Sequence, residues 1–295
     1  MAALNSPLAV AARDLPVGVF DSGVGGLTVL RALQASLPDE RFLYLGDTAR
    51  LPYGTKSAAT IIRYSLQAAA YLVDSGIKCL VVACNTASAA ALEVLRARYP
   101  ELPIVGVVEP GAAAGCLASV NGRIVVIATE GTVLGGAYQR AIARMRADAV
   151  VVARACPLFV SLAEEGWVQG PIVEAIAMRY LEDVFAARPS PDTLLLGCTH
   201  FPVLRAALQS VLGGAVTIVD SADTTAAAVV TLLRGRSLLA NTPVAQQLPE
   251  VRFLATDGRE RFARVAAYFL DRPIAAATVE LIDPGFAGVQ VDPLP

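Results

Sequence analysis

Short runs of apolar, often β-branched residues alternate with longer segments of mixed polarity from Val17 almost to the C-terminus. Eight of these runs predict strands, at residues 17–20, 41–45, 80–83, 104–108, 123–128, 193–197, 216–219 and 251–255. Between strands, Ser57 is a suitable N-cap for a helix with four apolar residues on one face: Ile62, Leu66, Ala69 and Val73. Such alternation is typical of βαβ units, so we expect an α/β fold of parallel sheets flanked by helices.

Two segments of the chain share one pattern. Residues 80–86 and 194–200 both run from an apolar strand through a small residue and a cysteine to two hydrogen-bonding residues that lead into a helix. Cys84 and Cys198 would then lie at the carboxyl ends of parallel strands, the edge where open α/β sheets bind ligands. We expect two pseudo-symmetric lobes, with the active site in the cleft between them.

A second, looser repeat pairs residues 17–23 with residues 125–131, each a strand that runs into a polar turn and a glycine. Pro110-Gly111 and Gly213-Gly214 are the strongest internal breakpoints. The expected division is an N-terminal tail (1–16), a first lobe carrying Cys84 (17–111 and 222–285), a second lobe carrying Cys198 (112–221) and a C-terminal tail (286–295).

Composition excludes several classes of partner. The chain has 26 acidic and 24 basic residues without runs of like charge, so neither nucleic acid nor an anionic membrane surface is an expected partner. No uncharged apolar run reaches the roughly 18 residues of a membrane span, and the N-terminus does not resemble a secretion signal. Five cysteines, an odd number, indicate reduced thiols rather than a disulfide framework. We expect a soluble, cytoplasmic protein.

The duplicated cysteines suggest a particular chemistry. The start of a helix favours a thiolate, so we expect a lowered thiol pKa at both positions. Racemisation needs two proton-transfer groups, one that removes the α-proton and one that delivers a proton to the opposite face. Two similar lobes supply such a pair. The alternative to a catalytic role is that a cysteine packs as a small hydrophobic residue. We expect this for Cys79, Cys116 and Cys156.

Three ionisable residues could tune these thiols: Asp21, Glu164 and His200, the single histidine. The acids are alternatively N-caps or surface carboxylates, and the histidine alternatively a structural imidazole. No metal is expected, because Cys198 and His200 are too close in sequence for the usual ligand pair and no second cluster exists. The glycine turn at residues 21–26 has neither the GxGxxG spacing nor the Gly-Lys-Ser/Thr ending of phosphate-binding loops, so no nucleotide is expected.

Four motifs in order carry a family resemblance: residues 19–27, 44–54, 83–88 and 197–202. From Val17 to about Ile282 the chain resembles the glutamate racemases. The resemblance implies a cytoplasmic, homodimeric isomerase that interconverts L- and D-glutamate for peptidoglycan synthesis and cell shape without pyridoxal phosphate or any other cofactor. One departure is Ser161, where the family usually has proline.

The resemblance also implies roles for individual residues. Cys84 and Cys198 would be the two acid/base groups, with Asp21, His200 and Glu164 assisting them. The residues expected to hold glutamate are Asp21, Ser22, Pro52, Tyr53, Gly54, Asn85, Thr86, Thr199 and His200.

Three rival functions stay open at this point. An aspartate racemase would also pair two cysteines in two lobes, although the motifs favour glutamate. A binding protein would hold an acidic metabolite in the cleft without turnover. A thiol redox protein expects a Cys-x-x-Cys pair, and the sequence contains none.

Overall fold

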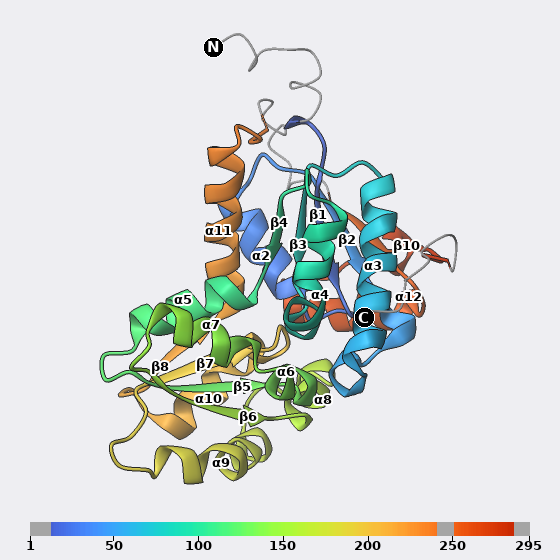
Figure 1. Ribbon diagram of the computed structural model, residues 1–295. Helices are drawn as coiled ribbons and strands as arrows, with labels where there is room; N and C mark the ends of the chain where they lie inside the picture. Colours follow the sequence, from blue (N-terminus) through green and yellow to red (C-terminus); the bar gives the residue numbers. More distant parts are fainter. Residues whose placement is uncertain (1–12, 241–250, 286–295) are drawn as a thin grey trace.

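The computed structural model describes residues 13–240 and 251–285 of the 295-residue chain. Two parallel sheets lie one above the other in Figure 1, each with helices on both faces. This arrangement confirms the predicted α/β fold with two lobes. Residues 1–12 of the predicted N-terminal tail and the predicted C-terminal tail, 286–295, lie outside the described residues. Within the described ranges no helix is long and apolar enough to cross a membrane.

The upper sheet in Figure 1 has six strands in the described part of the chain, in the order β10-β9-β2-β1-β3-β4, paired in parallel. Alternate side chains enter different cores, since Val19 packs on one face and Phe20 on the other. The strands are β1 (Val17–Asp21), β2 (Phe42–Gly46), β3 (Cys79–Val82), β4 (Ile104–Gly106), β9 (Val251–Ala255) and β10 (Val279–Leu281).

Among the residues that the structure describes, five helices cover this sheet. The core on the Val19 face is completed by α2 (Leu27–Ser36), α11 (Ser221–Gly235) and α12 (Arg259–Leu270). The core on the Phe20 face is completed by α3 (Ala58–Asp74) and α4 (Asn85–Arg98). One-turn 3₁₀ helices lie in the connections: η2 (Thr48–Arg50), η3 (Tyr53–Thr55) and η5 (Ala276–Thr278). We call this sheet with its helices the six-stranded lobe.

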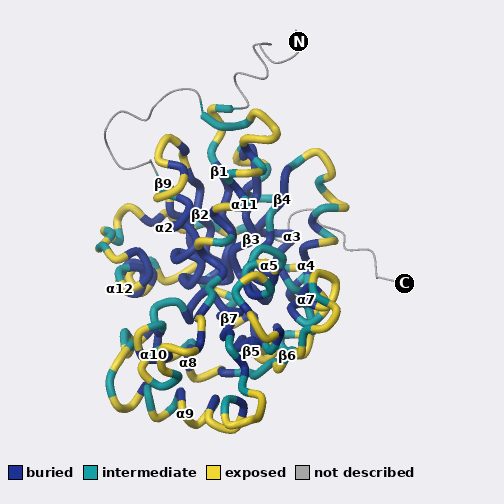
Figure 2. The backbone as a smooth tube through the Cα atoms, turned by 90° about the vertical axis from the view of Figure 1, so that its left-hand side faces the viewer, coloured by how far each residue is buried: buried dark blue, intermediate teal, exposed yellow. Residues whose placement is uncertain are grey.

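The lower sheet has four parallel strands among the described residues, in the order β6-β5-β7-β8, and forms the four-stranded lobe. Its core on one face includes α5 and α7, and on the other α8, α9, η4 and α10. Figure 2 shows buried backbone running through both sheets, with exposed stretches on outer helices and loops. The elements are β5 (Arg123–Ala128), β6 (Val150–Ala155), β7 (Thr193–Gly197), β8 (Thr217–Asp220), α5 (Val108–Ala118), α6 (Glu130–Gly135), α7 (Ala137–Met145), α8 (Leu158–Glu164), α9 (Pro171–Phe185), η4 (Phe201–Leu204) and α10 (Arg205–Leu212).

The strand order repeats between the lobes. β1 lies between β2 and β3, and β5 lies between β6 and β7 in the same way. Open α/β sheets bind ligands at the carboxyl ends of strands where the strand order reverses. Cys84 follows β3 and Cys198 follows β7, so the two cysteines occupy equivalent positions. The pseudo-symmetry predicted from the repeats is confirmed.

Two strands, β6 and β10, were not predicted. β6 is an edge strand whose residues are exposed or half-buried, and no glycine or proline separates it from α7. β10 has three residues, two of them exposed. β6 nevertheless carries an apolar run, Val150-Val151-Val152-Ala153, which the prediction overlooked. β10, with the sequence Val-Glu-Leu, is too short and too exposed to show the continuous apolar run of a buried parallel strand.

The local signals have mixed outcomes. The Oγ of Ser57 accepts a hydrogen bond from the Thr60 backbone N–H at 3.3 Å, which confirms the predicted N-cap. The breakpoint expected at Pro110-Gly111 lies inside the first turn of α5, where a helix tolerates proline. The division of the lobes at residues 111 and 221 stays a prediction.

Candidate active site

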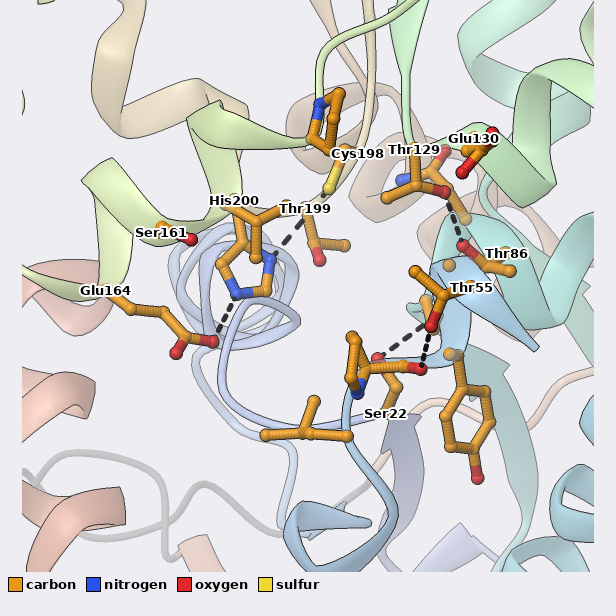
Figure 3. A pocket seen from close by; sticks show the side chains of 18 of the residues that line it. Ser22, Thr55, Thr86, Thr129, Glu130, Ser161, Glu164, Cys198, Thr199 and His200 are labelled. Carbon is orange, nitrogen blue, oxygen red and sulfur yellow. Dashed lines mark hydrogen bonds and ion pairs between the residues drawn. The ribbon is translucent and has the colours of Figure 1, made fainter.

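A cavity of about 290 Å³ lies between the carboxyl edges of the two sheets. Its lining comes from both lobes, as the close view in Figure 3 shows. Eleven of the twelve predicted site residues line it: Ser22, Pro52, Tyr53, Gly54, Cys84, Asn85, Thr86, Glu164, Cys198, Thr199 and His200. The topology thus brings these residues together from five separate parts of the sequence.

Cys84 is the N-cap of α4 and lies two residues after the end of β3. Its Sγ accepts a hydrogen bond from the Ala87 backbone N–H at 3.4 Å, and its thiol donates to Ser22 Oγ at 3.4 Å. Burial, reinforced by the charge of Asp21, raises the pKa of Cys84 to about 12. The expected lowering of this pKa is therefore wrong, because desolvation of a fully buried thiolate outweighs the helix start.

On the other side, three residues form a line that is visible in Figure 3. Cys198 Sγ lies 3.9 Å from His200 Nδ1, and His200 Nε2 lies 3.0 Å from Glu164 Oε1. Burial alone would lower the pKa of His200, but its contacts with Cys198 and Glu164 raise it to about 10. These contacts favour the imidazolium, and a protonated ring places a proton donor and a positive charge beside Cys198.

The carboxylate of Glu164 supports this charge. Burial alone would raise the pKa of Glu164, but hydrogen bonds and positive charge from His200 and Arg261 lower it below its ordinary value. Glu164 therefore lies in the site, and Ser161, the departure from the family pattern, lines the same cavity.

Asp21 is the predicted site residue that does not line the cavity. It is fully buried, and its Oδ2 accepts a hydrogen bond from the Gly23 backbone N–H at 2.8 Å. Burial raises the pKa of Asp21, and its charge acts on both Cys84 and His200. Asp21 lies behind the residues that line the cavity, so direct contact with a ligand in the cavity would require these residues to move.

Comparison with known proteins identifies the family. The family model described as Asp/Glu/Hydantoin racemase matches residues 27–229. A glutamate racemase from Geobacter metallireducens is 48% identical over 254 residues, which cover 86% of this chain and 92% of that protein. The chain belongs to the glutamate racemase family. Membership confirms the predicted enzyme class, a racemase.

Solved structures of glutamate racemases have the same fold. The Francisella tularensis enzyme, in complex with D-glutamate, aligns with a TM-score of 0.84 at 35% identity, covering 92% of this chain and 98% of that one. The Thermus thermophilus enzyme, in complex with β-chloro-D-alanine, aligns with a TM-score of 0.79 at 42% identity, covering 92% and 97%.

Sequence reasoning missed the hydroxyl cluster that joins the lobes of this racemase. Thr86 Oγ1 lies 2.9 Å from Thr129 Oγ1 and 3.1 Å from Thr132 Oγ1. Thr129 and Glu130 line the cavity opposite Ser22, as Figure 3 shows. The looser repeat, which equates β5 with β1, is the signal that could have identified them. Arg261 also lines the cavity, and no sequence signal indicated it.

Asn85 is oriented from the opposite lobe. The buried Tyr138 of α7 donates a hydrogen bond from its phenol to Asn85 Oδ1 at 2.6 Å. Asn85 Nδ2 is buried and has no partner within the described structure. The phenol thereby fixes which end of the amide is the free donor. Among the described residues, no group of three or more histidine, cysteine or acidic side chains is arranged to hold a metal ion.

Replacing Tyr138 with Phe is expected to lower the free energy of unfolding by about 1–3 kcal/mol, because it leaves Asn85 Oδ1 buried without a donor. Urea denaturation monitored by circular dichroism measures this change. Tyr71→Phe, at a half-buried position on α3, is the control and should change stability little. Equal stability of the Tyr138→Phe variant and the wild type would contradict this role of the phenol.

Proposed function

We propose that this protein interconverts L- and D-glutamate, with Cys84 and Cys198 as the two acid/base groups on opposite faces of the α-carbon. One observation carries the proposal. The two cysteines follow equivalent strands of two pseudo-symmetric lobes and line one cavity. Glutamate is the expected substrate because relatives with this fold are glutamate racemases, one of them solved with D-glutamate.

The proposed reaction balances with two thiols. The thiolate of one cysteine takes the α-proton, and the electron pair of the broken C–H bond remains on the α-carbon, delocalised into the adjacent carboxylate. The thiol of the other cysteine delivers its proton to the opposite face and becomes a thiolate. The next turnover of the product enantiomer exchanges the two roles.

The two cysteines have different surroundings, so different neighbouring residues would assist proton transfer at each of them. The raised pKa of Cys84 makes the thiol its resting form, and the ammonium group of bound glutamate would favour its thiolate. Asp21 and Ser22 assist this side. His200, supported by Glu164, assists Cys198.

Backbone and side-chain donors would hold the carboxylates of glutamate. Asn85 and Thr86 begin α4, and the free backbone N–H groups of a helix start favour an anion. Ser22, Thr199 and the loop of Pro52, Tyr53 and Gly54 complete the lining. We place the enzyme in the cytoplasm as a homodimer that supplies D-glutamate for peptidoglycan, without pyridoxal phosphate and without nucleic-acid or membrane partners.

The deciding experiment is a racemisation assay on exhaustively dialysed protein with L- and D-glutamate and L- and D-aspartate. The circular dichroism of either glutamate enantiomer should decay to zero, and added pyridoxal phosphate should change nothing. Decay with aspartate alone would indicate an aspartate racemase. Binding of glutamate with constant dichroism would indicate a binding protein, and activity only after addition of pyridoxal phosphate would refute the two-thiol mechanism.

A further inference from the structure

Helix α12 reaches from the six-stranded lobe to the Cys198 side of the cavity. Arg261 Nη2 lies 2.7 Å from Glu164 Oε2, in the last turn of α8. Two turns further along α12, the ring of Phe269 meets the ring of His200 nearly edge-on, at a centroid distance of 5.2 Å. Residues 261 and 269 lie on one face of the helix. The six-stranded lobe therefore contacts both residues that assist Cys198.

A neighbouring contact shows how closely α12 fits this region. A Cβ atom on Gly166, just beyond α8, would lie 2.7 Å from the ring of Tyr268. Gly166 lies two residues after Glu164, so the backbone next to Glu164 is packed against α12. The contact of Arg261 is thus part of a packed surface between the lobes.

The two oxygens of Glu164 have different partners. Oε2 accepts a hydrogen bond from Arg261, and Oε1 pairs with His200 Nε2 at 3.0 Å. The terminal torsion of a glutamate is broad, so one hydrogen bond alone leaves the carboxylate free to turn. A second donor on the other oxygen restricts it. The Glu164 and His200 side chains are 11% and 6% exposed, which strengthens their interaction relative to a surface pair. The Arg261 side chain is 55% exposed, so its guanidinium holds the carboxylate from the solvent side.

We propose that Arg261 is a positioning residue for the Cys198 half of the reaction: it fixes the Glu164 carboxylate so that Oε1 orients the His200 ring toward Cys198. The inference rests on the proposed two-thiol function. Arg261 itself need not contact glutamate, since its guanidinium acts through Glu164. Because Arg261 lies on a helix of the six-stranded lobe and Glu164 on a helix of the four-stranded lobe, the orientation of His200 depends on how the two lobes pack together.

The first test needs no substrate. His200 is the single histidine, so untagged protein labelled with [¹⁵N]histidine has one imidazole spin system. The Nε2–H proton should exchange with water about tenfold faster in Arg261→Ala than in the wild type, because the hydrogen bond to Glu164 is less well held. Arg261→Lys should restore part of the protection. Arg264→Ala, at an exposed arginine on the same helix, is the matched control and should exchange as the wild type does.

The second test separates positioning from substrate binding. In Arg261→Ala we expect kcat to fall about tenfold with KM nearly unchanged. The two enantiomers have equal free energies, so the equilibrium constant is one and kcat/KM must fall equally in both directions. Isotope effects are therefore needed to show which of the two proton transfers is slowed. For α-deuterated substrate of the hand that Cys198 deprotonates, the isotope effect should rise. For the opposite hand it should fall, because reprotonation by Cys198 then limits the rate.

Several outcomes would overturn the proposal. They are an unchanged His200 signal in folded Arg261→Ala, a loss confined to KM, isotope effects that move alike for both enantiomers, or equal losses in Arg264→Ala. The two levels of inference remain distinguishable. A wild-type protein that racemises nothing refutes the proposed function, whereas the exchange rate of the His200 proton still tests the contact with Arg261.

Discussion

Replacing either Cys84 or Cys198 with alanine should lower glutamate racemisation by at least about 10² to 10⁴-fold, the usual loss on removing a positioned acid or base. Each cysteine would reach one face of the α-carbon, so neither can perform both transfers. Racemisation is measured by circular dichroism, and folding by urea denaturation. Cys116→Ala, at a half-buried cysteine that does not line the cavity, is the control and should keep wild-type turnover.

Heavy water gives an independent test of the same pair. Product formed by the wild type should carry deuterium at the α-carbon, because the delivering thiol exchanges with solvent. Remaining substrate should stay largely unlabelled early in the reaction if the removed proton returns faster than its thiol exchanges. Product without deuterium, or near-wild-type racemisation by a folded Cys84→Ala or Cys198→Ala variant, would eliminate the two-thiol mechanism.

Gly25→Ala should lower turnover by about 10²-fold, the loss expected when catalytic groups move by about 1 Å. Gly25 lies in the turn after β1, and an added Cβ would lie 2.3 Å from His200 Nδ1 and 2.5 Å from Thr199 Oγ1. These distances are too short, so the His200 ring and the Thr199 side chain must move. Steady-state racemisation kinetics on the folded variant measure the effect.

Gly235→Ala is the matched control. Gly235 is the last residue of α11, and an added Cβ would meet no atom within 4 Å. The substitution should leave turnover unchanged. Wild-type kinetics in folded Gly25→Ala would show that the close approach of the glycine turn to His200 has no role in catalysis. Close packing explains why glycine is needed at both residues 25 and 26. A Cβ atom on Gly26 would lie 2.5 Å from the Cβ atom of Asp21.

Much of the site was accessible from the sequence because it depends on strand ends. Apolar runs identify buried parallel strands, and the residues that follow them lie at a common edge. The cavity is lined by both cysteines and by Ser22, Asn85 and Thr199, all of which lie within two residues of the end of such a run. The duplicated pattern around the cysteines also predicted two similar lobes, because a repeated strand–cysteine–helix pattern indicates that the same βα unit occurs twice. β6 was not predicted although residues 150–153 form an apolar run, and no glycine or proline marks its start after α7.

The sequence by itself determined the α/β class, the two-lobe repeat and the two cysteines that line the cavity, all of which follow from local pattern. Only the tertiary structure decided how deeply each group is buried and what faces it. It placed Asp21 behind the cavity wall and raised rather than lowered the pKa of Cys84, because desolvation depends on the whole surrounding structure. It also brought Arg261 to Glu164, 97 residues apart in the chain, because lobe packing sets that contact and no local pattern encodes it.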